Sequence, residues 1–238
     1  MPPAAPQTPS RRSAARAGGE RRNVRGDATR LRILRAAERL FADQGIAAAP
    51  LRDIGVAAGQ RNHAAVQYHF GDRDRLVREI LEARGAESEA ARADLVAGLA
   101  AGGAPATVED VVSAFIWPLA IHLQADNHYL AFLSRLIIEV GGYEGLSGAD
   151  VHTGASTFTL RTLLGRLVPS LPGEVLDERW SVAETSAVHA LARYQAAQRV
   201  RHATPARIEV LIPDLVRFLA AGIVAPLADD DPRAVASG

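Results

Sequence analysis

Residues 28–80 read ATRLRILRAAERLFADQGIAAAPLRDIGVAAGQRNHAAVQYHFGDRDRLVREI, and this stretch decides the fold. Its first part carries apolar residues at the 3.6-residue period of an amphipathic helix, namely Ile33, Ala37, Leu40 and Phe41. Asp27 precedes this stripe as a good N-cap, and Gly45 follows it as a C-terminal stop. The spacing therefore predicts one helix between Asp27 and Gly45.

The second part of the stretch predicts two shorter helices joined by a tight turn. Apolar spacing resumes at Leu51 and Ile54, and Gly59 can adopt the left-handed conformation that such a turn requires. Beyond it, Ala65, Val66 and Phe70 can pack on the first helix. The other positions are polar or small: Arg61, Asn62, His63, Ala64, Gln67, Tyr68 and His69. A helix lying in a major groove needs such an outer face, so the pattern indicates a helix-turn-helix with a reading helix over residues 60–69.

A fourth helix is predicted to begin just after this unit. Asp72 is its N-cap, and Arg73 beside a helix N-terminus is a natural phosphate contact. A helix-turn-helix shape also occurs inside ordinary helical bundles, so the pattern leaves DNA binding and plain packing open. The same alternatives apply to Tyr68 and His69, each of which is either a packing residue or a DNA contact.

Residues 28–80 resemble the DNA-binding domain of the tetracycline-repressor (TetR) family of one-component regulators. The matching residues are Ile33, Ala36, Ala37, Leu40, Phe41, Gly45, Leu51, Asp53, Ile54, Ala58, Gly59, Val66, Tyr68, His69, Phe70, Asp72, Arg73, Asp74 and Leu76. The chain departs from the family at Ala49-Pro50, where Ser or Thr is usual, at Gly55, and in a longer turn over residues 60–63. The longer turn leaves open which of its side chains reaches base edges.

The resemblance and the pattern together give a set of candidate DNA contacts. They are Arg25, Arg52, Gln60, Arg61, Asn62, His63, Ala64, Gln67, Tyr68, His69 and Arg73. Charge supports this assignment, because residues 1–84 contain 16 Arg against 9 Asp and Glu, and the rest of the chain contains 11 Arg against 18. A basic head on an acidic body is expected when only the head binds phosphate.

Residues 1–26 are rich in Pro, Ala, Arg and Gly and have no apolar period, which predicts a disordered tail. Two interpretations of its six arginines remain: a solvated tail, or an arm that follows phosphates or enters the minor groove. The tail is the better interpretation for Arg11–Arg16, and the arm for Arg21–Arg25, which adjoin the first helix. The segment lacks the apolar core of a secretory signal. Deleting residues 1–20 should weaken DNA binding and lower its salt dependence if the arm contacts DNA.

The sequence from about residue 72 onward predicts an all-α fold, because it contains no run of alternating apolar and polar residues. We expect a helix-turn-helix domain over 27–71, a helical effector and dimerisation domain over 72–227 and a flexible tail over 228–238. The predicted helices of the body are 72–100, 107–125, 127–140, 154–168, 174–200 and 205–225, with kinks at Pro118 and Pro213. No apolar stretch approaches the ~20 residues of a membrane span, so we expect a cytoplasmic protein with no membrane partner.

Catalytic, metal and cofactor sites are not predicted. The chain has no Cys, and no nucleophile elbow, glycine-rich phosphate loop or zinc-binding His motif is present. His122 and His128 flank a helix junction, where histidines more often cap or line than ligate metal. The sequence therefore predicts a binding protein and not an enzyme.

Resemblance to the family implies a small hydrophobic effector held among the middle helices of the body. The candidate ligand contacts are Trp117, His122, Tyr129, Phe132, Arg135 and Phe158, which combine apolar surface with polar tips. The alternative is that the aromatic residues are simply core, and for Phe132 this is the better interpretation.

The last two helices occupy the position of the family's dimer interface. Small residues dominate one face of 182–200, namely Val182, Ala183, Ser186, Ala187, Ala190, Leu191, Tyr194 and Ala197. Apolar residues dominate 205–225, namely Ile208, Leu211, Ile212, Leu215, Phe218, Leu219 and Ile223. Both faces could form a four-helix bundle between two chains, or pack within one. We expect a homodimeric repressor of a palindromic operator; the alternatives are an activator, a nonspecific DNA-binding protein or a helical protein-interaction module.

Overall fold

The computed structural model describes residues 11–60, 62, 64–101, 103, 105–124, 126–141, 155–199 and 207–227, with side chains from Gly26 onward. Its helices are α1 (Arg11–Gln44), α2 (Leu51–Ala57), α3 (Ala65–Phe70), α4 (Arg73–Ala101), α5 (Val108–Ile116), the 3₁₀ helix η1 (Trp117–His122), α6 (Tyr129–Val140), α7 (Ala155–Leu167), α8 (Gly173–Arg199) and α9 (Ile208–Val224). The described residues contain no strand, which confirms the predicted all-α class.

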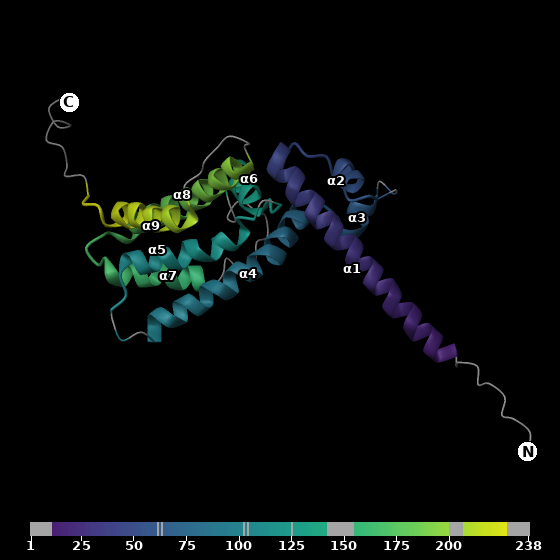
Figure 1. Ribbon diagram of the computed structural model, residues 1–238, viewed down its shortest axis with the longest axis horizontal. Helices are drawn as coiled ribbons and strands as arrows, with labels where there is room; N and C mark the ends of the chain where they lie inside the picture. The colour runs from purple at the N-terminus through teal and green to yellow at the C-terminus, as the bar shows by residue number, and fades with distance from the viewer. Residues whose placement is uncertain are drawn as a thin grey trace, which may run out of the picture.

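Helices α1 to α3 form a head at one end of the molecule, and α5 to α9 form the body (Figure 1). The head packs through the predicted stripe, since Ile33, Ala37 and Phe41 are fully buried. Helix α4 begins beside the head and runs along the body, so it belongs to both parts (Figure 1). Movement at either end of α4 can therefore reach the other.

Two glycines end head helices as predicted. Gly45 follows α1 with φ +99°, and Gly59 follows α2 with φ +70°. Both values lie in the left-handed region, which a residue with a Cβ adopts only under strain. Gly45 also lies against the body, because a Cβ built on it would come within 2.6 Å of Glu139 Oε1. The positive φ therefore requires a glycine there, and a larger side chain would displace the Glu139 carboxylate.

The prediction of disorder is wrong for residues 11–26. Helix α1 continues back to Arg11, and Asp27 lies inside the helix instead of capping it. Residues 11–25 contain three Ala and six Arg, both good helix formers, and the prolines of the N-terminal segment all precede Arg11. Extending a helix that packing already holds avoids the cost of nucleation. Residues 1–10 and the predicted tail 228–238 lie outside the described residues.

The predicted helix 107–125 is divided in two. Thr107 caps α5 through a capping box with Asp110, and α5 ends at Ile116. Pro118 lies near the start of η1, where it lacks the amide hydrogen that a continuing α-helix needs. The break predicted at Pro118 is thus a change of helix type. Pro213 lies inside α9 as expected.

Much of the apolar face of α9 packs within the monomer. Ile212, Leu219 and Ile223 are buried, and Ile208, Leu211 and Leu215 are partly buried against the same core. On α8, Ala183, Ala187 and Leu191 are likewise buried. These nine residues were predicted as dimer surface, and the structure uses them to join α8 and α9 to the rest of the body. Val182 and Phe218 remain exposed from the predicted faces.

Candidate nucleic-acid interface

Helix α3 presents its polar side to solvent. Ala65, Val66 and Phe70 are buried under it, whereas Gln67 is exposed and the Tyr68 side chain is 85% exposed. A phenol ring left in water does not serve as packing, so the packing alternative for Tyr68 is wrong. Gln67 offers both a donor and an acceptor, the combination that reads an adenine edge.

The reading helix is shorter than predicted, since α3 begins at Ala65 and not near residue 60. Asn62 accounts for the difference: its Oδ1 accepts from the Ala64 amide at 3.0 Å, and its backbone oxygen accepts from the Ala65 amide at 3.0 Å. Asn62 therefore forms an Asx turn before the helix, whose N-cap is Ala64. Gln60 is also occupied, because its Nε2 donates to Ala58 O at 3.1 Å.

The other candidate contacts surround α3 unevenly. Arg52 on α2 and Ala64 are exposed, and His69 is half-buried with its ring edge-on to Tyr68. Arg61 and His63 lie outside the described residues, and of Arg25 only the position in α1 is known. The structure thus brings Asn62, Ala64, Gln67 and Tyr68 to one exposed face.

Arg73 has a structural role that the sequence did not predict. Its guanidinium donates to the backbone oxygens of Ile46, Ala47 and Ala49, in the loop between α1 and α2. These bonds use both Nη1 hydrogens and one Nη2 hydrogen, three of the five donors of the guanidinium. Arg73 therefore holds the loop, a role that the sequence did not indicate, and its phosphate contact stays a prediction.

Arg30 was missed by sequence reasoning, although it fixes the end of α3. Its guanidinium lies 4.7 Å from the centroid of the Phe70 ring, donates to His69 O at 3.2 Å and pairs with Glu79 of α4. A cation over an aromatic face is attractive. One side chain of α1 thereby holds α3 and α4 together.

Two carboxylates fasten the head to the body. Glu139 of α6 accepts from the amides of Ile46 and Ala47 through Oε2, at 2.8 and 3.1 Å. Glu38 of α1 is buried and accepts from Arg84 Nε at 2.7 Å and from the His128 amide at 3.1 Å. No sequence motif signalled these partners, because each is some 90 residues away from at least one of its contacts.

The predicted effector contacts do not gather around one cavity. Tyr129 and Phe132 are buried in the core, and Phe132 stacks on Phe41 of the head with ring centroids 6.2 Å apart. Trp117 and Phe158 are exposed, the latter by 75%. Arg135 is also exposed and lies near the head, with Nε 3.5 Å from Ala42 O. His122, Tyr129 and Phe132 do lie together, with the Tyr129 ring centroid 4.6 Å from that of His122 and 6.1 Å from that of Phe132. Helix packing thus keeps three of the six predicted residues together and directs the other three to different surfaces.

His122 also belongs to a buried group of polar residues. We call this group the His122 cluster, and its members are Ser88, His122, Asn127 and Gln195. Its Nε2 is 2.8 Å from Ser88 Oγ, and its Nδ1 is 3.4 Å from Asn127 Nδ2. Gln195 Nε2 donates to the backbone oxygens of His122, Gln124 and Asn127. The cluster therefore ties α4, η1 and α8 to the turn that precedes α6.

Acid should destabilise the protein through His122. Burial, followed by the charge of Arg84, lowers the pKa of His122 from 6.5 to about 4. Between these values the unfolded chain binds a proton that the folded chain does not, so the free energy of unfolding falls as the pH drops. We expect up to about 1.4 kcal/mol per pH unit from this side chain.

Urea unfolding at several pH values between 6.5 and 4 measures this dependence. His122→Gln should flatten the slope, and His189→Gln, a half-buried histidine on α8, should leave it unchanged. Burial also lowers the pKa of His128, so part of the slope remains in both variants. Identical slopes in wild type and His122→Gln would contradict the assignment.

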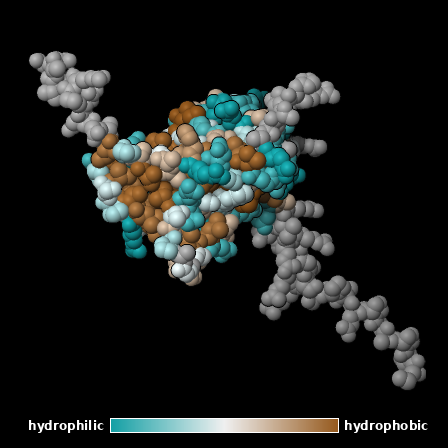
Figure 2. Space-filling model, turned by 60° about the vertical axis from the view of Figure 1, so that its left-hand side comes forward, coloured by the Kyte–Doolittle hydropathy of each residue, from teal (hydrophilic) through white to brown (hydrophobic). Residues whose placement is uncertain are grey.

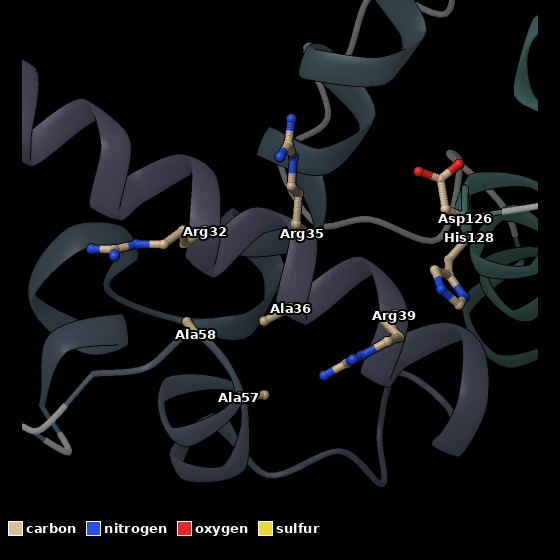
Figure 3. Close-up of a pocket in the computed structure, with 8 residues that line it drawn as sticks. All are labelled: Arg32, Arg35, Ala36, Arg39, Ala57, Ala58, Asp126 and His128. Atoms are coloured by element: carbon tan, nitrogen blue, oxygen red, sulfur yellow. The ribbon is translucent and has the colours of Figure 1, made fainter.

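A cleft of about 320 Å³ lies where the head meets the body. Its lining residues are Arg32, Arg35, Ala36 and Arg39 of α1, Ala57 of α2, Ala58 just after it, and Asp126 and His128 from the turn before α6. Figure 3 shows the three alanines between the Arg32 and Arg39 side chains. None of the lining residues comes from α3.

Comparisons with known proteins agree with the geometry of the head. Residues 33–80 match the family model for bacterial regulatory proteins of the tetR family. Among curated proteins, none is similar enough in sequence to match.

Two solved structures are similar over most of the chain. One is described as a TetR-family transcriptional regulator from Mesorhizobium loti, with 15% identity and a TM-score of 0.46; it covers 84% of this chain and 95% of its own. The other is a TetR-family regulator from Streptomyces coelicolor, with 22% identity and a TM-score of 0.39; it covers 83% of this chain and 95% of its own. None of the helices in the described part of the chain has the length and apolar character of a membrane-spanning segment.

Proposed function

Because residues 33–80 identify this chain as a member of the TetR family of bacterial regulatory proteins, we propose that it represses transcription as a ligand-responsive homodimer. Each protomer inserts α3 into the major groove of one half of a palindromic operator. Two-fold symmetry then places the half-sites about one helical turn apart, ~10 bp centre to centre. The observation that carries this proposal is the exposed polar face of α3, held on a buried apolar side.

The charge of the head supports the same proposal. The N-terminal 84 residues hold most of the arginines of the chain, and electrostatic attraction to phosphate supplies much of the affinity of any DNA-binding protein. Gln67 and Tyr68 then add base contacts, which carry the sequence preference. A repressor with such contacts blocks a promoter simply by occupying it.

A small hydrophobic effector releases the operator in this proposal. Helix α4 is the mechanical link, since Leu76 and Val77 at its start pack into the core and Ser88 further along joins the His122 cluster. An effector that separates the helices around this cluster would shift α4 and with it the spacing of the two heads. Coupling of this kind typically changes affinity by ~1–3 kcal/mol.

DNase footprinting on the DNA that flanks the protein's own gene tests the proposal. A protected, two-fold symmetric site supports a specific repressor and supplies the probe for effector screening. Uniform binding with a steep salt dependence and no sequence preference would instead indicate a nonspecific DNA-binding protein.

Gln67→Ala should weaken operator binding by about 1–3 kcal/mol and relax the preference at one base pair of each half-site. Gln67 is exposed on α3, so its loss leaves the core intact. Binding to the footprinted site and to variants changed at single base pairs measures both effects. Gln124→Ala, an exposed glutamine of the body, is the matched control and should bind as wild type does. If Gln67→Ala weakened binding equally on every DNA sequence, Gln67 would contact a phosphate and not a base.

A further inference from the structure

The cleft between head and body has an unusual composition. Three arginines, Arg32, Arg35 and Arg39, follow one another at spacings of three and four residues, which places them on one side of α1. The helical rise sets Arg32 and Arg39 about 10 Å apart along the axis. Small side chains form the floor between them, so a ligand can approach the backbone closely (Figure 3).

These arginines are not neutralised within the described part of the chain. Arg35 and Arg39 form no ion pair with any described carboxylate, and Arg32 donates only to Thr29 Oγ1, at 3.1 Å. By contrast, Arg30 on α1 and Arg84 on α4 both pair with glutamates. Three guanidinium groups around one cleft repel each other unless an anion joins them.

The other charged groups near the cleft do not offset the positive charge of these three arginines. Asp126 is the one carboxylate in the lining, while Glu38 nearby is already occupied by Arg84. Asp43 and Arg199 act on the His128 ring with opposite signs. Burial lowers the pKa of His128, so its ring is neutral near pH 7 and adds no charge of its own. The lining therefore keeps a positive excess.

Duplex DNA fits the cleft less well than a small molecule does. The far wall is formed by Asp126 and His128 of the body, and no lining residue comes from α3, so the cleft does not share the exposed face of the reading helix. A volume of about 320 Å³ matches the lower end of the ~300–1,000 Å³ of small-molecule sites. Guanidinium groups also suit phosphate and carboxylate, since they donate in pairs.

The geometry points to a second ligand site in this cleft, which binds a small molecule carrying at least two anionic groups of the phosphate or carboxylate type. Arg32 and Arg39 each hold one group, and the alanine floor accommodates the atoms between them. The site differs from the effector region proposed above, because α1 and the end of α2 form its floor, and the two regions share only the turn before α6. A ligand there contacts head and body together and so holds one against the other.

Calorimetric titration of the full-length protein with inorganic pyrophosphate tests this site at constant ionic strength. We expect saturable binding with one site per chain, and weaker binding of inorganic phosphate, which carries one anionic group. Arg39→Gln and Arg32→Gln should each lower the pyrophosphate affinity about tenfold or more, because each removes charge-assisted hydrogen bonds. Arg166→Gln, an exposed arginine of α7, should leave it unchanged.

Thermal unfolding gives a second measurement, since a ligand that binds only the folded chain raises its Tm. Pyrophosphate should raise the Tm of wild type and Arg166→Gln but not that of Arg39→Gln. Unsaturable heats, or equal affinities in all four proteins, would overturn the proposal. A third result would also overturn it: wild type binds no pyrophosphate, and Arg39→Gln binds operator DNA with a weaker salt dependence than wild type does. The cleft would then contact DNA and not a small molecule. The titrations contain no DNA, so their result is independent of the proposed repressor function.

Discussion

Glu38→Gln should lower the free energy of unfolding by about 3–5 kcal/mol, the range for breaking a buried ion pair by removing one partner. Glu38 is 4% exposed and accepts from Arg84 through both of its oxygens, at 2.7 and 3.3 Å. Burial would lower the pKa of Arg84, but the hydrogen bond and the charge of Glu38 outweigh it and the pKa is raised. The amide replacement keeps the shape of the side chain and removes the charge, so the loss includes the cost of leaving the Arg84 charge without its partner.

The effect should extend to the contact between the head and the body. Glu38 Oε1 also accepts from the His128 amide, which precedes α6. In the variant, the Arg84 guanidinium and this amide compete for a single carbonyl oxygen. The turn before α6 would then lose its attachment to α1, and the head would sample more orientations relative to the body.

Urea unfolding followed by circular dichroism measures the change in stability. Glu82→Gln is the matched control, because Glu82 is an exposed glutamate on the same helix as Arg84 and should change stability by less than about 0.5 kcal/mol. If Glu38→Gln and wild type had the same free energy of unfolding, the attraction between Glu38 and Arg84 would only balance the cost of removing them from water.

The head could be predicted from sequence where a local pattern determines the structure. The stripe Ile33, Ala37 and Phe41 is buried, and both Gly45 and Gly59 have positive φ. Asp72 caps α4 by accepting from the Arg75 amide at 2.7 Å. Each of these features depends on residues within a few positions, so periodicity and capping rules describe them fully.

Contacts between distant residues could not be predicted in the same way. Glu38 and Glu139 looked like ordinary charged positions on helix surfaces, yet each bonds an amide about 90 residues away. The start of α3 was also missed, since Asn62 was interpreted as part of the reading helix and instead forms a turn before it. A polar side chain does not reveal from sequence whether its partner is water, DNA or a backbone amide.

The effector residues failed for a related reason. Aromatic and polar-tipped residues were grouped by their position along 117–158, but helix packing keeps only His122, Tyr129 and Phe132 together and leaves the others on separate surfaces. Phe132 faces the head, whereas Phe158 faces solvent. Proximity in sequence predicts which helix carries a residue and not which neighbour covers it.

Phe218→Glu should convert a dimer into a monomer and weaken operator binding by about 10²–10⁴, the gain that linking two binding sites provides. Phe218 on α9 is 73% exposed, and Val210 on the same helix and Val182 on α8 are 61% and 54% exposed. Hydrophobic side chains also gather on the part of the body turned forward in Figure 2. Exposed apolar area of this kind is unusual on a monomer and marks a surface that another protein covers.

The proposed dimer therefore uses what the monomer leaves uncovered. Most residues of the faces first predicted for α8 and α9 are buried in the core of the same chain. We therefore place the dimer contact at the exposed residues Phe218 and Val182. Two-fold symmetry brings the same stripe from each chain together. A carboxylate at Phe218 would be desolvated opposite its own copy, where like charges repel.

Size-exclusion chromatography with light scattering measures the assembly, and titration of operator DNA measures the affinity. Phe158→Glu is the matched control, because Phe158 is 75% exposed on α7, outside α8 and α9, and the substitution is identical. It should remain dimeric and bind DNA as wild type does. A wild-type protein that is already monomeric, or a dimer that survives Phe218→Glu, would require a different surface. In that case palindromic recognition would depend on assembly on DNA, since a lone head gains nothing from the second half-site.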